Sequence, residues 1–140
     1  MTKPLIGCVC TQIKMASRTV GRRYDEALKG SSVNVVQYSI LINTRRYEPI
    51  AQMELADHLD MERTTLYRAI DVLEKRGLVV SEATGEGVAK SVRLTAKGRK
   101  VTADAETRWR EVHDGFVAVF GTEKLDSLNQ MLATVREHFR

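Results

Sequence analysis

Residues 52–95 contain the pattern that decides the fold, and they read QMELADHLDMERTTLYRAIDVLEKRGLVVSEATGEGVAKSVRLT. Apolar residues recur there in steps of three and four, which predicts a short helix over 53–59 and a longer helix over 62–76. Gly77 suits the C-terminal cap of the second helix. The buried side of this second helix is expected to consist of Leu66, Ile70 and Leu73.

A β-hairpin is predicted directly after these two helices. Residues 78–83 and 90–94 read as short strands, and two glycines within 84–87 suit a reversing loop between them. A helix-turn-helix followed by such a hairpin, or wing, is an arrangement that places one helix in the major groove of DNA. We therefore expect residues 34–94 to form a winged helix-turn-helix.

Long amphipathic helices are expected on both sides of this unit, over 8–30 and 95–140. Gly121 interrupts the second of these segments, and Thr122 is expected to cap the final helix. The predicted fold class is therefore mainly α with a small β-wing, in one domain over residues 1–140.

The terminal helices carry more apolar residues than a small winged helix can cover. We expect them to pair with a second copy of the chain in an isologous homodimer, with Leu128, Leu132 and Val135 near the contact. The alternative is a monomer whose terminal helices close one core.

Composition restricts the function classes. The chain of 140 residues has no apolar run long enough to span a membrane and no secretory pattern at its start, so the cytoplasm is the default location. No glycine-rich phosphate loop, metal motif or nucleophile elbow occurs, so neither an enzyme nor a bound cofactor is expected. The net charge is only +4, and residues 52–94 hold six basic against eight acidic side chains. DNA binding must therefore be inferred from the face that each charge occupies.

The N-terminal part of the second helix presents polar side chains opposite its buried side. An arginine can bond guanine O6 and N7, a threonine methyl can contact thymine, and hydroxyl groups suit phosphate. An ordinary solvated helix is the alternative, because such side chains alone are weak evidence. The side chains that would enter the groove are Arg63, Thr64, Thr65, Tyr67 and Arg68.

The segments LADHLDMERTTLYRAIDVLEKRGLV and VRLTAKGR resemble the MarR family of bacterial transcription regulators, as do YDEAL and VVQYSIL nearer the start. The resemblance implies a triangular homodimer that binds a palindromic operator in double-stranded DNA. It also implies repression that a small molecule or an oxidant relieves. At matching positions it assigns DNA contacts to Thr64, Thr65, Tyr67 and Arg68, with Arg63 nearby.

The wing departs from the pattern of this family. Many members carry an arginine there that enters the minor groove, whereas this chain has Glu86-Gly87-Val88 at the matching position. Lys90 and Arg93 are the nearest cations, and they are expected to contact phosphate instead. This departure and the acidic balance keep open a second function, a winged-helix protein-interaction module without specific DNA binding.

Cys8 and Cys10 lie at or just before the start of the first helix. A helix N-terminus lowers the pKa of a thiol, and some members of the resembled family sense oxidants with a cysteine near this position. If residues 8–10 are helical, the two side chains point about 200° apart and cannot bond to each other. The alternatives are two buried structural thiols or a metal site, and no histidine has ligand spacing to the cysteines.

A small-molecule effector would need a pocket, and the region between the terminal helices and the winged helix is the expected place. Aromatic side chains at helical spacing are also typical of an ordinary core, so both interpretations stay open. The candidates for lining such a pocket are Tyr24, Tyr38, Trp109 and His113.

Overall fold

Six helices and a small three-stranded sheet make up the computed structural model, which describes residues 7–83 and 89–140. This architecture confirms the predicted fold class. Within the described ranges no helix is long and apolar enough to cross a membrane. The elements in chain order are α1 (Val9–Leu28), α2 (Val35–Tyr47), β1 (Ile50–Ala51), α3 (Gln52–His58), α4 (Arg63–Lys75), β2 (Val79–Ala83), β3 (Lys90–Leu94), α5 (Ala96–Phe120) and α6 (Thr122–His138).

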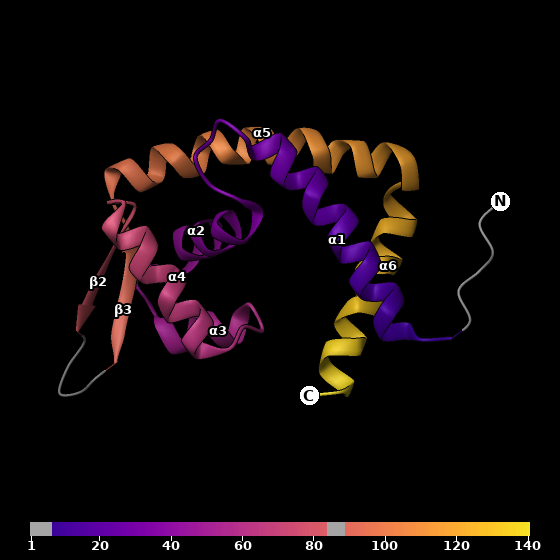
Figure 1. The fold of residues 1–140 in the computed structure, drawn as a ribbon, viewed down its shortest axis with the longest axis horizontal. Helices are drawn as coiled ribbons and strands as arrows, with labels where there is room; N and C mark the ends of the chain where they lie inside the picture. Colours follow the sequence, from indigo (N-terminus) through magenta and orange to yellow (C-terminus); the bar gives the residue numbers. More distant parts are fainter. Residues whose placement is uncertain (1–6, 84–88) are drawn as a thin grey trace.

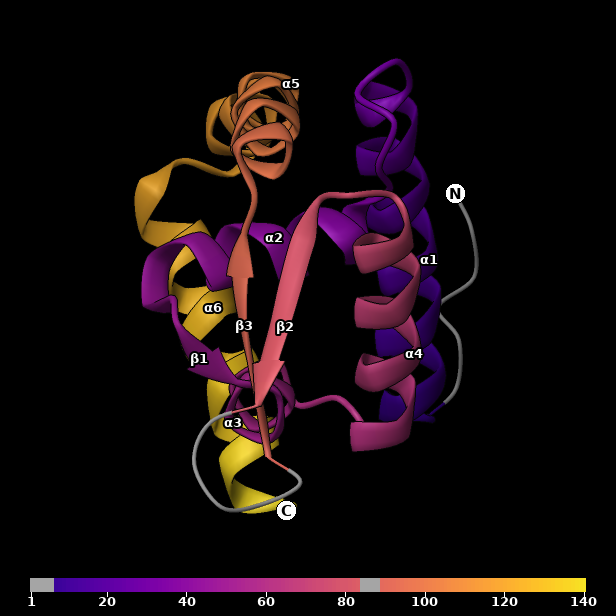
Figure 2. The ribbon, with the colours of Figure 1, turned by 90° about the vertical axis from the view of Figure 1, so that its left-hand side faces the viewer.

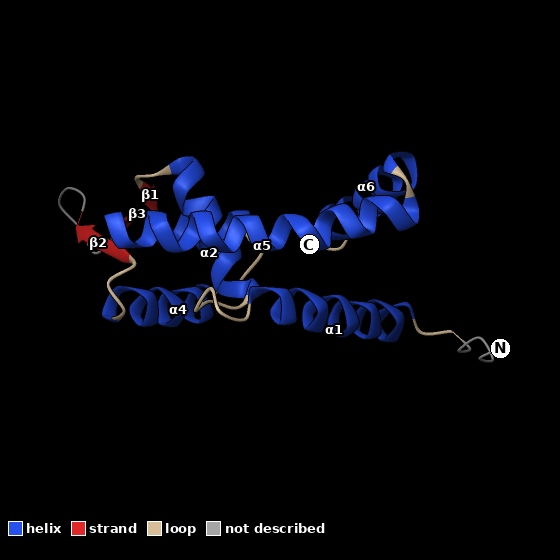
Figure 3. Cartoon of the chain, turned by 90° about the horizontal axis from the view of Figure 1, so that it is seen from above, coloured by secondary structure: helices blue, strands red, loops and turns tan. Residues whose placement is uncertain are grey.

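Figure 1 shows α5 running along the length of the molecule, with the winged helix-turn-helix below one end and α1 and α6 below the other. Seen from above, α4 and α1 lie nearly end to end in one row, and α5 and α6 form a second row (Figure 3). Helix α1 packs against α5, and α2 packs against both. The long helix α5 therefore connects the winged unit to the terminal helices without a break.

The sheet consists of the wing and one additional short strand, in the order β1-β3-β2 (Figure 2). All pairs are antiparallel, and β1 joins the free edge of β3 with Ile50 opposite Val92. The sequence did not predict β1, because two residues directly after Pro49 are too few to show the alternation of a strand.

The apolar side of α4 forms the centre of the core, as predicted. Leu66, Ile70 and Leu73 are fully buried there. The start of α5 packs so closely on this unit that a β carbon at Gly98 would lie 1.9 Å from the carbonyl oxygen of Leu78. The first turn of α5 and the base of the wing are therefore in direct backbone contact, which only glycine permits.

Two helix starts show how local chemistry sets the boundaries. The Asn34 side chain accepts a hydrogen bond from the Gln37 N–H at 2.9 Å, and the Gln37 side chain accepts one from the Asn34 N–H at 3.0 Å, a reciprocal cap for α2. The expectation that Thr122 caps α6 was wrong. The N-cap is Gly121, whose φ of 76° suits glycine, and Thr122 is already helical.

The terminal helices leave much of their apolar surface uncovered within one chain. Helix α6 buries none of its residues, and α1 buries only Leu28. Within one chain this apolar surface therefore stays open to solvent, and the homodimer stays a prediction. Their exposed large apolar side chains include Val9, Ile13, Met15, Leu128, Met131, Leu132, Val135 and Phe139.

Candidate nucleic-acid interface

Helix α4 presents a polar face to solvent at its N-terminal end. Arg63, Thr64, Thr65 and Arg68 are exposed, and Tyr67 is half-buried on the flank, as the helical spacing predicted. The N-cap residue has an extended backbone and makes no side-chain capping bond. The N–H groups of the first turn therefore have no side-chain cap, and together with the helix dipole they can bind phosphate oxygens.

The two arginines on this face are free to recognise DNA. Neither Arg63 nor Arg68 forms an ion pair or a side-chain hydrogen bond with another residue in the described ranges. An exposed guanidinium without a partner can bond a guanine edge or a phosphate without first breaking a bond within the protein.

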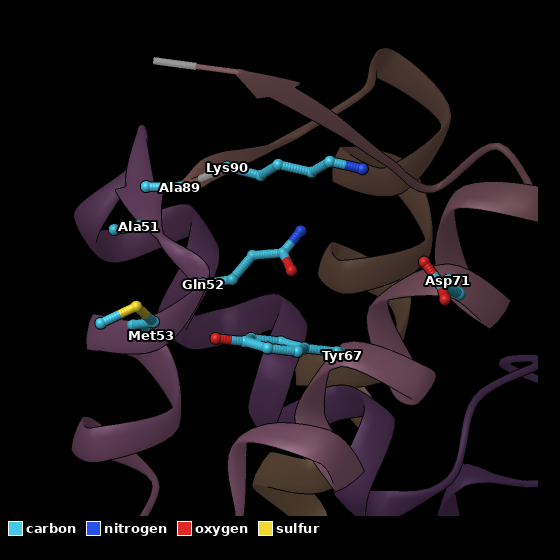
Figure 4. A pocket seen from close by; sticks show the side chains of 7 residues that line it. All are labelled: Ala51, Gln52, Met53, Tyr67, Asp71, Ala89 and Lys90. Atoms are coloured by element: carbon cyan, nitrogen blue, oxygen red, sulfur yellow. The ribbon is translucent and has the colours of Figure 1, made fainter. Parts of the chain in front are cut away.

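A pocket of about 400 Å³ opens beside this face, between α3, α4 and the wing (Figure 4). Tyr67 of α4 and Lys90 of β3, which the sequence named separately, both line it. Figure 4 shows the Tyr67 hydroxyl pointing toward the start of α3 and the Lys90 side chain extending across the opposite side. The fold therefore places a hydroxyl and an ammonium group around one pocket, and both groups can donate hydrogen bonds.

Three further residues line this pocket, and the sequence did not single them out as DNA contacts. Gln52 and Met53 belong to the first turn of α3, and Asp71 lies one turn beyond Arg68 on α4. The Gln52 amide donates a hydrogen bond to Ser81 Oγ at 3.0 Å and so ties α3 to the wing. Only the tertiary arrangement reveals this role, because the two residues are distant in sequence.

Arg93 does not join Lys90 at the pocket. Alternation along β3 places the two residues on opposite faces of the wing, and Val92 and Leu94 share the inner face with Lys90. Arg93 instead pairs with Glu82 Oε1 at 2.8 Å. The two cations therefore lie on opposite faces of the wing, Arg93 in an exposed ion pair, and a phosphate contact by either of them stays a prediction. The predicted departure at Glu86-Gly87-Val88 lies outside the described residues.

Cys8 is the N-cap residue of α1, and Cys10 lies in its first turn. Both thiols are exposed in the single chain. Hydrogen bonds from the Thr11 side chain, and then from the Thr11 and Cys10 N–H groups, hold the pKa of the Cys8 thiol below its ordinary value. Because Cys8 has an extended backbone, the premise that residues 8–10 are all helical was wrong, and the angular argument against a bond between the thiols does not apply.

The four aromatic candidates form one row of neighbouring rings, in which Tyr24 and His113 stack on Trp109 and Tyr38 is tilted against it. Trp109 is the centre, with ring centroids 6.5 Å from Tyr24, 6.1 Å from Tyr38 and 4.7 Å from His113. Burial, and then the Glu106 carboxylate, raise the pKa of Tyr38 to about 12, so its hydroxyl is neutral at physiological pH. The row is thus partly core, and it runs from α2 into the space between α1 and α5.

Next to this row, a second pocket of about 300 Å³ lies between α1 and α5. Phe116, which stacks on Tyr24 at 5.7 Å, forms one wall, and Arg23 and Glu111 add charges at the rim. The sequence did not single out these residues. Among the described residues, no group of three or more His, Cys, Asp or Glu side chains has a geometry suited to a metal ion.

Comparison with known proteins gives a consistent result. The family model described as MarR family matches residues 31–87. The Mycobacterium tuberculosis transcriptional regulator MosR, solved in complex with DNA, superposes with a TM-score of 0.84 at 32% identity and covers 96% of this chain and 99% of its own. The transcriptional repressor CouR, solved bound to a 23-mer DNA duplex, superposes with the same TM-score of 0.84 at 25% identity and covers 96% of this chain and 99% of its own. An HTH-type transcriptional regulator of Bacillus cereus is 26% identical over 115 residues, which are 81% of this chain and 77% of the relative.

The winged helix-turn-helix and its exposed, unpaired reading face define a DNA-binding transcription regulator. The chain belongs to the MarR family.

Proposed function

We propose that the protein is a homodimeric repressor, not an enzyme, that binds a palindromic operator and leaves it when an oxidant or a small ligand acts on the dimer. The observation that carries this proposal is the reading face of α4, where Arg63 and Arg68 are exposed and have no partner in the described ranges. Such a regulator works where its DNA lies, which for a bacterial protein is the cytoplasm.

The apolar surface of the terminal helices supports the homodimer. Leu128, Leu132 and Val135 recur along one side of α6, and each is more than a third exposed in the single chain. A second copy would cover this side through a symmetric contact, which would place two α4 helices in successive major grooves.

Contacts with the operator follow from the geometry of each half. In this proposal Arg68 reads a guanine edge, Thr64 and Thr65 contact thymine or phosphate, and Tyr67 with Lys90 holds a phosphate at the pocket. Arg93 can contribute only after it leaves Glu82.

Two features could receive the releasing signal. The Cys8 thiolate is exposed and favoured by hydrogen bonds, so it can attack a hydroperoxide to give a sulfenic acid and an alcohol. The pocket between α1 and α5 could instead admit a ligand with an aromatic part, since it adjoins the row of aromatic rings. The similar protein CouR has been solved with p-coumaroyl-CoA, which supports the second route.

A salt-dependent gel shift on the promoter region next to the protein's own gene tests the function. Specific binding should persist over competitor DNA and weaken steeply with salt, because each phosphate contact releases counterions. Absence of specific binding to this promoter and to a random-sequence pool would favour the protein-interaction module.

The same assay separates the two signals. Hydroperoxide should release the unmodified protein, whereas a variant with both cysteines replaced by serine should stay bound. If both proteins respond alike, the thiols are not the switch, and the pocket between α1 and α5 becomes the effector site.

A further inference from the structure

The connection between α1 and α2, residues 29–34, is held from two sides by arginines. Its backbone is unusual, since Gly30 and the non-glycine residue Ser32 both have left-handed conformations, with φ of 91° and 68°. A non-glycine residue keeps such a conformation only where its surroundings hold it. Contacts from neighbouring elements must therefore hold Ser32 in this conformation.

The first arginine comes from the reading helix. Arg76 is the C-cap residue of α4, and its Nη2 donates a hydrogen bond of 2.5 Å to the carbonyl oxygen of Ser32. The Arg76 carbonyl oxygen in turn accepts a bond of 2.8 Å from Lys97 Nζ. The C-terminal end of α4 is thus tied both to the strained residue of the connection and to the start of α5.

The second arginine comes from α5. Arg108 Nη1 donates to the carbonyl oxygen of Lys29 at 3.1 Å, and Asp104 Oδ2 orients the same side chain by accepting from Nε at 3.2 Å. The guanidinium lies 3.4 Å from where a β carbon on Gly30 would be. Glycine is therefore favoured at residue 30 by its φ, and an added β carbon would make only an ordinary van der Waals contact with this guanidinium.

These bonds link the reading helix to the terminal helices. Helix α4 packs mainly on α3 and β2, so it has little direct contact with α1. Figure 3 shows α4 and α1 in one row with the connection between them. The hydrogen bond from Arg76 to Ser32 directly joins α4 to the connection that follows α1. Arg108 fixes the N-terminal end of the same connection to α5.

We propose that Arg76 is a positioning residue, which sets the place of α4 relative to α1 and thereby the separation of the two reading helices in the dimer. This inference rests on the proposed function for its consequence at the operator. Half-sites must lie about one helical turn apart for two such helices to bind together. Without the bond from Arg76 to Ser32, α4 would still fold and contact bases. The distance between the two α4 helices of the dimer would then vary.

A distance measurement tests the positioning without DNA. Spin labels are attached at Lys14→Cys on α1 and Thr64→Cys on α4, in a chain with Cys8→Ser and Cys10→Ser, and diluted with unlabelled chain so that only distances within one chain remain. Arg76→Met should broaden or shift the distance distribution, and Arg76→Lys should restore most of it. Lys75→Met is the matched control, because Lys75 is exposed and makes no bond in the described ranges.

A second measurement tests the consequence at DNA. A palindromic duplex is selected from a random-sequence pool with the unmodified protein, and versions with an inserted base pair between the half-sites are compared. The unmodified protein and Lys75→Met should reject the longer duplexes, whereas Arg76→Met should lose much of this discrimination while its binding to a single half-site stays unchanged.

An unchanged distance distribution in Arg76→Met overturns the proposal, whatever the protein does with DNA. If Arg76→Met does not fold, Arg76→Gln repeats the test with a shorter side chain that cannot reach Ser32. Failure of both variants to fold would make the bond a requirement of the fold and would reject the positioning role. Absence of DNA binding by the unmodified protein would contradict the proposed function alone.

Discussion

At the scale of single residues, the position of an arginine determines whether its guanidinium group is available to bind DNA. Arg68 is exposed on the reading face and has no partner in the described ranges, whereas Arg93 is on the outer face of the wing and paired with Glu82. An arginine without a partner can bond a base edge bidentately, and a paired one must first lose its carboxylate. Arg68 is therefore expected to contribute more to the affinity for DNA than Arg93.

Arg68→Ala should leave the dimer folded and weaken specific binding by about 1–3 kcal/mol, as expected for the loss of a bidentate base contact. Lys75→Ala, which removes a charge at the far end of the same helix, serves as the control and should cost much less. Titration of labelled operator by fluorescence anisotropy measures both. If Arg68→Ala binds the operator as tightly as the unmodified protein, Arg68 makes no base contact and is only a surface residue.

Lys90→Ala should weaken binding to all sequences to a similar extent, because a phosphate contact carries no base information. The slope of log affinity against log salt should become shallower by about one unit. Arg93→Ala should change this slope less, since Glu82 already neutralises Arg93. A larger effect of Arg93→Ala than of Lys90→Ala would show that the pocket is not the phosphate site.

The thiol of Cys8 gives a prediction in pH. Its lowered pKa means that the folded protein holds more thiolate than the unfolded chain at neutral pH, so the midpoint of its alkylation rate should lie at lower pH than in the unfolded chain. In Cys10→Ser, Cys8 is the remaining thiol, and iodoacetamide kinetics against pH report on it alone. Denaturant should move the midpoint up to the ordinary value. An identical midpoint before and after unfolding would remove the basis for a reactive thiolate.

At the scale of elements, the joint between the wing and α5 is a close backbone contact. The first turn of α5 lies against the Leu78 carbonyl oxygen, and this approach leaves no room for a side chain at Gly98. A displaced α5 would shift the base of the wing and the pocket with it.

Gly98→Ala should therefore destabilise the protein by about 1–3 kcal/mol, as other overpacked sites do. Gly115→Ala is the matched control in the same helix, where a β carbon meets nothing within 4 Å. That change should be neutral or stabilising by up to about 1 kcal/mol, because alanine favours a helix over glycine. Urea unfolding at one fixed protein concentration measures both, and an equal effect of the two changes would refute the close packing.

At the scale of the whole molecule, the terminal helices leave apolar surface open that the proposed dimer would cover. Helix α6 buries nothing within one chain, and its side chains Leu128, Leu132 and Val135 together form an apolar stripe. Covering such surface contributes about 25 cal/mol for each Å² removed from water, so a symmetric contact along two helices can hold a dimer.

Leu132→Asp should yield monomers or an unfolded chain, because it would bury a carboxylate at the contact. Gln130→Asp, also exposed on α6, is the control and should leave the mass unchanged. Light scattering gives the mass of each variant. A stable monomer for the unmodified protein would contradict both the dimer and the operator geometry.

Much of this architecture could be predicted because helix periodicity is local. Leu66, Ile70 and Leu73 recur within a few residues of one another, so the buried side of α4 and its opposite polar face follow from spacing alone. Contacts between residues that are distant in sequence carry no such signal. The strand β1, the pocket that joins Tyr67 to Lys90, and the bond from Arg76 to Ser32 each depend on how separate elements pack, and only the folded chain brings those residues together.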